Sequence, residues 1–179
     1  MSNQRASFYD GIPMRGDLTI IIRDAKTRKK IRKIEIRNKI TFLAADILVE
    51  LLAQRTPTLD PTPDKQLLYS MRMGLSNTPA ARSDTNLGTF EIGKVLADVN
   101  KITGVPGELE LTAELEAGEA NGVTLQEAGL FTAGSTPSAD GPVGTTPGTA
   151  RMFSRQIHPA IPKTSAIVLD YSWRIAFTA

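Results

Sequence analysis

A strict alternation of apolar and polar residues in one short segment constrains the fold more than any other feature of the sequence. In Glu108–Glu116 three leucines and an alanine would point to one face, whereas four glutamates and a threonine would point to the other. A period of two is typical of a half-buried strand in an antiparallel sheet. A helix would instead spread the glutamates around its whole circumference, so we expect a strand.

The closing segment, Ala166–Phe177, shows the same period and contains Trp173, the single tryptophan of the chain. Six apolar residues at alternate positions, Trp173 and Tyr171 among them, would face the core, so this strand should be central. Shorter runs with β-branched or alternating apolar residues predict further strands. These are Leu18–Arg23, Lys30–Arg37, Leu67–Leu75, Phe90–Val99, Thr124–Thr132 and Arg151–Pro159.

One segment, Asn38–Gln54, has the periodicity of a helix. Its apolar residues recur one turn apart, and Asn38 or Thr41 could cap its start. We therefore expect an all-β fold, an antiparallel β-sandwich, with one packed α-helix near residues 40–54.

The length of 179 residues fits one domain, or two very small ones. Residues 1–17 are predicted to form an N-terminal arm, and residues 18–179 a single β-sandwich domain. Within that domain, Ala133–Ala150 has 13 Gly, Pro, Ser or Thr residues among 18, a composition that favours a flexible insertion at 133–150.

Charge is distributed in two opposed blocks. Arg23–Lys39 has nine basic and two acidic residues, and Gly107–Ala128 has six glutamates and no basic residue. Copies of such a chain could attract one another head to tail, although two solvated strand faces explain the pattern equally well. The candidate subunit or partner contacts are Arg28, Lys29, Lys30, Arg32, Lys33, Glu108, Glu110, Glu114 and Glu116.

The sequence offers little for catalysis, cofactors or metals. Cysteine is absent, the single histidine, His158, is followed by Pro159, and neither a nucleophile elbow nor a phosphate-binding loop occurs. The glutamates of Glu108–Glu116 share one open strand face rather than facing each other across a cleft, as glycoside hydrolysis requires. We expect no catalytic residue, no cofactor and no metal site.

The basic segment, Arg23–Lys39, is the best candidate for a binding surface. It lacks the aromatic residues or groove-binding helix of nucleic-acid readers, so an acidic protein surface is the favoured partner and nucleic acid is unlikely. No membrane partner is expected, because the longest apolar stretch, Ile40–Ala53, is too short to span a bilayer.

Several short motifs, in this order, resemble virion structural proteins of tailed bacteriophages. They are Arg23-Asp-Ala-Lys-Thr-Arg28, Arg37-Asn-Lys-Ile-Thr41, Met73-Gly-Leu-Ser-Asn-Thr-Pro79, Asp84-Thr-Asn-Leu87, Gln126-Glu-Ala-Gly-Leu-Phe131, Arg151-Met-Phe-Ser-Arg155, Ile161-Pro-Lys-Thr164 and Leu169-Asp-Tyr-Ser-Trp-Arg-Ile-Ala-Phe177. The resemblance covers about residues 11–179.

The residue types in these motifs suit structural roles. Glu127 has an apolar neighbourhood and would need a cation across the sheet, either Arg151, Arg155 or Lys163, because a desolvated charge must be paired. Gly129 would allow a bulge or a close approach of strands.

The resemblance implies a non-enzymatic subunit of a phage particle, made in the host cytoplasm and located in the virion. It would assemble in several copies, as a trimer or larger ring with other phage structural proteins, in the neck, tail or baseplate. The alternatives are a capsid decoration (cement) protein or, less favoured, a receptor-binding module at a fibre tip. A cell-wall hydrolase is disfavoured.

Overall fold

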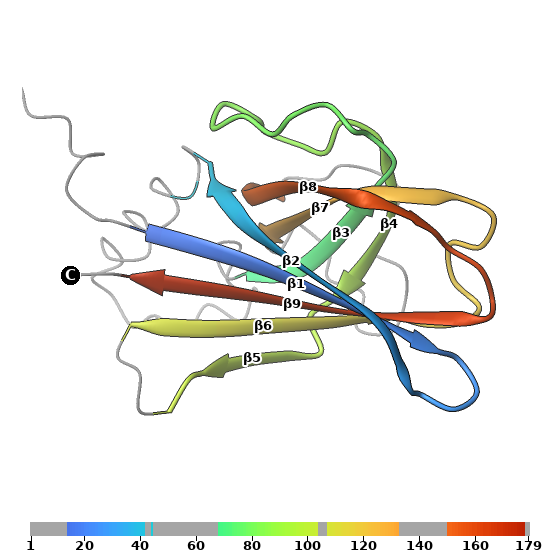
Figure 1. Ribbon diagram of the computed structural model, residues 1–179. Coiled ribbons are helices and arrows are strands. Elements are labelled where there is room, and N and C mark those ends of the chain that lie inside the picture. Colours follow the sequence, from blue (N-terminus) through green and yellow to red (C-terminus); the bar gives the residue numbers. More distant parts are fainter. Residues whose placement is uncertain (1–13, 42–43, 45–67, 104–106, 133–149, 178–179) are drawn as a thin grey trace, which may run out of the picture.

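The computed structural model describes residues 14–41, 44, 68–103, 107–132 and 150–177, and these residues form nine β-strands (Figure 1). The strands are β1 (Met14–Asp24), β2 (Lys30–Ile40), β3 (Leu68–Gly74), β4 (Phe90–Val95), β5 (Asp98–Lys101), β6 (Glu108–Leu115), β7 (Thr124–Thr132), β8 (Met152–Pro162) and β9 (Ile167–Phe177). The alternation in Glu108–Glu116 is therefore confirmed as a strand, β6.

Every strand pairing is antiparallel, and the strands form two sheets that share β2. The first sheet has the order β2-β1-β9-β6-β5, and the second has the order β4-β3-β7-β8-β2. Most of β2 pairs with β1, but its last residues, Lys39 and Ile40, pair with Arg155 and Ser154 of β8. In consequence β2 joins the two sheets along one side, whereas β4 and β5 are edge strands.

The two sheets bury their facing side chains in one apolar core. Leu18 and Ile20 of β1 and Trp173 of β9 belong to the same buried cluster as Met71 and Met73 of β3. The closing strand is central in the first sheet, between β1 and β6, as its buried aromatic residues predicted.

The second sheet is also covered on its outer face. There, Leu87 from the loop between β3 and β4 packs against Phe131 and Met152 in a second, smaller cluster. The residues of β7 from Glu127 to Thr132 are consequently all buried, without the alternation of a half-exposed strand.

Three expectations need correction or lie outside the described residues. The predicted helix cannot begin at Asn38, because Asn38–Ile40 continue β2 and pair with strands on both sides. The hydroxyl of Thr41 donates to the carbonyl oxygens of Met152 and Phe153, each at 2.9 Å, and the N–H of Ala44 donates to the carbonyl oxygen of Thr41 at 3.3 Å. The predicted helix is not seen as an element in the described residues: Ala44 alone is described there, with helical backbone, and 42–43 and 45–54 lie outside them.

Most of the predicted N-terminal arm and of the predicted insertion also lies outside the described residues. Residues 1–13 and 133–149 are not described, whereas Met14–Asp17, expected in the arm, belong to β1. The predicted strand Phe90–Val99 is two strands, β4 and β5, which are edges of different sheets. In the part of the chain that is described, no helix is long and apolar enough to cross a membrane.

Candidate functional site

The most deeply buried charged group of the second sheet is the carboxylate of Glu127, which is 0% exposed. Oε1 accepts hydrogen bonds from the backbone N–H of Ser76 at 3.1 Å and of Thr89 at 2.8 Å. Oε2 accepts from the N–H of Gly88 at 3.0 Å and from Nε of Arg155 at 2.8 Å. Four donors therefore compensate the loss of water around this carboxylate.

Arg155 extends the network from β8 to the loop between β3 and β4. Its Nη1 lies 2.7 Å from Oδ2 of Asp84, and Nη2 donates to the carbonyl oxygen of Thr78 at 3.2 Å. Burial alone would lower the pKa of Arg155, but its hydrogen bonds to Asp84 and Glu127 outweigh that effect and raise the pKa. The guanidinium is thus a permanent cation between two carboxylates.

We refer to Glu127, Arg155 and Asp84 as the buried clamp. Glu127 and Arg155 bind the loop between β3 and β4 through backbone groups of Ser76, Thr78, Gly88 and Thr89 and through the carboxylate of Asp84. These contacts hold residues 76–89 against the outer face of the second sheet. The side chain of Glu127 is 0% exposed and that of Arg155 is 4% exposed. Glu127 and Arg155 are therefore inaccessible to a substrate, whereas the side chain of Asp84 is 23% exposed.

Two glycines make room for the clamp. A Cβ atom at Gly74 would collide with the carbonyl oxygen of Thr89 and with the carboxylate of Glu127. A Cβ at Gly129 would lie 3.0 Å from Leu87, Phe131 and the backbone of Ser154. The close approach of strands expected at Gly129 is present toward Ser154 of β8, and at both Gly129 and Gly74 the loop also lies close to the sheet.

Of the three cations considered for Glu127, the structure pairs it with Arg155. Lys163 is buried elsewhere, and its Nζ donates to the carbonyl oxygen of Thr164 at 3.1 Å and more weakly toward Asn121 in the turn between β6 and β7. Desolvation lowers the pKa of Lys163. The backbone N–H of Arg151 donates to the hydroxyl of Thr132 at 2.9 Å.

A second buried arginine, Arg72 of β3, has no carboxylate partner among the described residues. Its guanidinium lies 4.3 Å from the ring centroid of Phe131 and 6.0 Å from that of Phe90. It faces Gly93 on one neighbouring strand and Gly129 on the other. Burial lowers the pKa of Arg72, and its Nε has no hydrogen-bond partner in the part of the chain that the structure describes.

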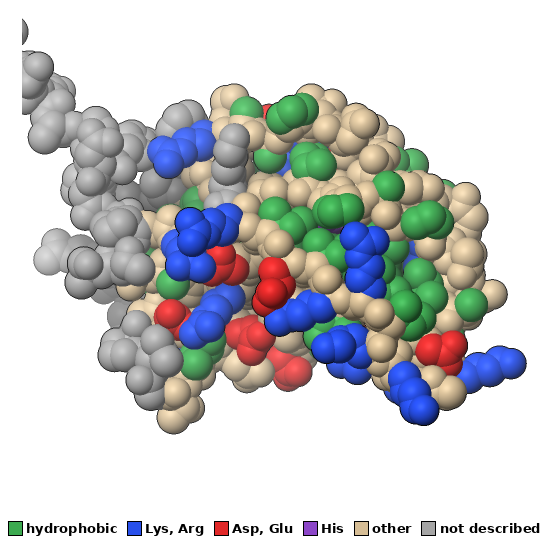
Figure 2. All heavy atoms as spheres, viewed as in Figure 1, with side chains coloured by type: hydrophobic (Ala, Val, Ile, Leu, Met, Phe, Trp, Pro, Cys, Tyr) green, Lys and Arg blue, Asp and Glu red, His purple; other side chains and the backbone are tan. Residues whose placement is uncertain are grey.

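The outer face of the first sheet carries charges of both signs (Figure 2). The basic hairpin of β1 and β2 and the acidic strand β6 lie in the same sheet, and they contact each other. Arg28 pairs with Glu114, and its second terminal nitrogen lies 4.0 Å from Glu116. Arg174 of β9 pairs with Glu108. Part of the charge of the two opposed blocks is therefore paired within the chain.

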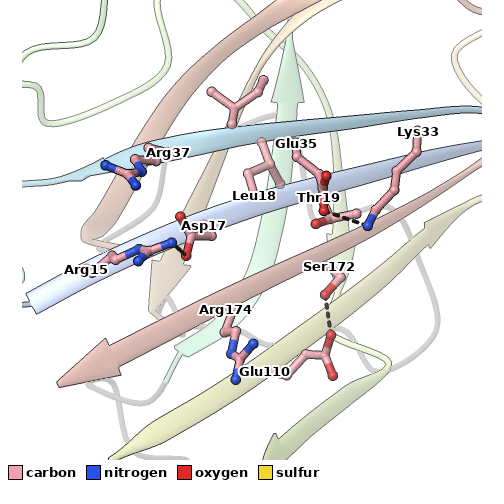
Figure 3. A pocket seen from close by; sticks show the side chains of 11 residues that line it. Arg15, Asp17, Leu18, Thr19, Lys33, Glu35, Arg37, Glu110, Ser172 and Arg174 are labelled. Atoms are coloured by element: carbon pink, nitrogen blue, oxygen red, sulfur yellow. Dashed lines mark hydrogen bonds and ion pairs between the residues drawn. The ribbon is translucent and has the colours of Figure 1, made fainter. Parts of the chain in front are cut away.

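A shallow depression of about 520 Å³ lies on this face (Figure 3). Asp17 pairs with Arg15 at 2.8 Å, Lys33 with Glu35 at 2.5 Å, and the hydroxyl of Ser172 donates to Glu110. With four cations and three anions in its lining, the depression does not select a ligand of one charge. The lining residues are Arg15, Asp17, Leu18, Thr19, Lys33, Glu35, Ile36, Arg37, Glu110, Ser172 and Arg174.

The remaining predicted contact residues, Lys29, Lys30 and Arg32, are exposed and form no ion pair with another described residue. No group of three or more potential metal ligands occurs within the described ranges. Sequence reasoning did not assign roles to Asp84 or Arg72. Asp84 stands in one of the motifs quoted above, whereas nothing in the pattern around Arg72 marks it as an unpaired cation.

Comparison with known proteins finds no matching family model, no similar curated protein and no similar solved structure.

Proposed function

We propose that this chain is a non-enzymatic structural subunit of a tailed-bacteriophage particle, assembling in several copies in the neck, tail or baseplate. One observation carries the proposal. Three motifs on which the resemblance rests contribute the residues of the buried clamp: Asp84–Leu87, Gln126–Phe131 and Arg151–Arg155. A fourth motif, Met73–Pro79, contributes backbone groups of Ser76 and Thr78 that bind the clamp.

This convergence supports a building block rather than a catalyst. Glu127 and Arg155 are removed from solvent, so the shared residues serve to fix a loop on a sheet. A buried ion pair of this kind adds little net stability compared with apolar residues, but losing one partner costs about 3–5 kcal/mol. Such an arrangement suits a subunit that must keep one loop conformation within a symmetric assembly.

We further propose that the two sheets form a β-sandwich, with β2 closing one side. The layers meet in one shared core, which supports this arrangement. The outer face of the first sheet and the hairpin of β1 and β2 then remain for contacts with neighbouring subunits. The predicted contact residues Arg28 and Glu114 pair with each other, so they orient this surface rather than bind a partner directly.

Two measurements test the proposed function. Mass spectrometry and immunogold labelling of particles from the phage that encodes the chain should detect it in the particle, at the neck, tail or baseplate. Labelling of the head would instead favour the capsid decoration alternative. Sedimentation at low salt should give a trimer or larger. A monomer at high concentration, absent from purified particles, would refute the proposal.

A further inference from the structure

We propose that the end of the β1–β2 hairpin, residues 24–32 (the hairpin tip), is a preformed docking element for an acidic protein surface that carries an apolar side chain. The proposal combines four unpaired cations, an exposed isoleucine and a turn whose conformation is fixed by the chain itself. It does not depend on the proposed phage function.

The turn is held by its own hydrogen bonds. Oδ1 of Asp24 accepts from the backbone N–H of Thr27 at 2.7 Å, from its hydroxyl at 2.8 Å and from the N–H of Lys26 at 3.2 Å. These hydrogen bonds, that of the Thr27 N–H foremost, lower the pKa of Asp24. Arg28 has a φ of 57°, and its N–H donates to the carbonyl oxygen of Asp24 at 2.9 Å. The backbone of the tip is therefore organised before any partner binds.

The hairpin tip is also anchored to the rest of the molecule on two sides. The N–H of Ala25 donates to the carbonyl oxygen of Ala166, before β9, at 2.8 Å. On the other side, the guanidinium of Arg28 pairs with Glu114 on β6. Preorganisation of this kind lowers the entropy cost of binding.

The cations that are not used for anchoring gather at one corner of the molecule, where the turn between β1 and β2 lies (Figures 1 and 2). Lys26, Lys29, Lys30 and Arg32 are exposed, and none of them forms an ion pair with another described residue. Ile31 stands between two of them and is 60% exposed, the most exposed large apolar side chain in the described chain. Its exposure leaves apolar area that a partner could bury.

This composition fits an acidic protein better than a nucleic acid. Protein interfaces combine apolar side chains at their centre with charged groups at their rim, and the hairpin tip offers both kinds: exposed Ile31, and the exposed cations Lys29, Lys30 and Arg32 next to it in the sequence. A phosphate backbone would use the cations but offers no apolar contact. Single-stranded nucleic acids bind through stacked aromatic side chains, and Arg23–Arg37 contains none.

Titration of the ¹⁵N-labelled full chain, followed by NMR, tests the inference. The probe is a peptide of repeated Glu-Gly-Leu-Glu units; the comparison ligands are the same peptide with serine in place of leucine and a short DNA duplex. We expect the leucine peptide to shift the amide signals of residues 24–32 first. The Lys29→Gln/Lys30→Gln/Arg32→Gln variant should weaken binding about tenfold, and Ile31→Asn should weaken it about fivefold.

Two matched variants, Lys101→Gln and Arg82→Gln, remove exposed cations elsewhere and should leave binding unchanged. Circular dichroism establishes that every variant is folded. The inference is overturned if no amide of the hairpin tip shifts at the highest soluble peptide concentration, or if the serine peptide binds as well as the leucine peptide. Tighter binding of DNA through the same residues, insensitive to Ile31→Asn, would also overturn it in favour of nucleic acid.

Discussion

Substituting Glu127 by glutamine should destabilise the protein far more than any exposed glutamate would. The carboxylate accepts two hydrogen bonds at each oxygen, whereas a glutamine side chain accepts only at one and donates at the other. In either orientation the new amide N–H₂ would face two of the donors that now bind the carboxylate. One pair is Ser76 and Thr89; the other is Gly88 and the charged Arg155.

The expected magnitude follows from these contacts. An unsatisfied buried donor costs about 1–3 kcal/mol, and more when it is charged. Two such donors together with the lost ion pair predict a loss of about 3–5 kcal/mol in the free energy of unfolding. The whole free energy of unfolding of a domain is only about 5–15 kcal/mol. For a chain of this length, the midpoint of thermal unfolding should fall by about 6–20 °C.

Urea and thermal unfolding, followed by far-ultraviolet circular dichroism and by the fluorescence of buried Trp173, measure the effect. The matched control is Glu35→Gln, at a carboxylate whose side chain is 66% exposed and pairs with Lys33. It should change stability by no more than about 0.5 kcal/mol. The double variant Glu127→Gln/Arg155→Met should lose less free energy of unfolding than the two single variants lose in sum, because the two side chains interact. A loss below about 1 kcal/mol for Glu127→Gln, or strict additivity, would refute this account of the clamp.

Four further substitutions test other buried groups by urea unfolding. Arg72→Met should be neutral or stabilising by about 1–2 kcal/mol, since it removes a buried cation without an ion-pair partner in the described chain; a large loss would show that the guanidinium is paired after all. Tyr171→Phe should cost less than about 0.5 kcal/mol or stabilise, because the buried hydroxyl has no hydrogen-bond partner among the described residues. Gly74→Ala should lose at least about 2 kcal/mol through the collision with Thr89, and wild-type stability would contradict the close approach. Desolvation lowers the pKa of His158, so the unfolded chain binds its proton first; wild-type stability should therefore fall relative to His158→Phe as the pH drops below about 6.5, and parallel pH profiles would argue against a buried neutral imidazole.

The strands could be predicted from sequence wherever a strand has one buried and one solvated face. Glu108–Leu115 and Ile167–Phe177 are of this kind, and their alternation predicted both strands and the central place of Trp173. Phe90–Val99 was interpreted as one strand because local periodicity says nothing about sheet membership. In the structure the chain leaves the edge of the second sheet after Val95 and enters the edge of the first at Asp98.

For the buried clamp, the sequence predicts the need for an ion pair but not which cation forms it. An apolar neighbourhood indicates that Glu127 needs a cation, but three cations lay at plausible distances along the chain. The choice depends on register, since Gly129 of β7 is opposite Arg155 of β8 and a register shift follows between Leu130 and Phe131. Such irregularities have no clear signature in the sequence.

The same limitation applies to the two charge blocks. Net charge along the chain separates a basic segment from an acidic one but does not indicate whether they share a sheet. Strand order shows that they do, because β6 lies in the sheet that contains β1 and β2. The order of strands within a sheet depends on packing and on the geometry of the connections. A count of charges along the chain contains no information about either.

Pairing within the chain also determines which charges remain for partners. Arg28 and Glu114 neutralise each other, and Arg155 is enclosed by Glu127 and Asp84, so none of these groups can add much attraction toward another molecule. Lys29 and Lys30 differ because the turn that presents them is already fixed by Asp24, and their ammonium groups form no ion pair with another described residue. If the molecule binds through charge, the physical distinction between satisfied and unsatisfied cations places that binding at the hairpin tip rather than over the whole basic segment.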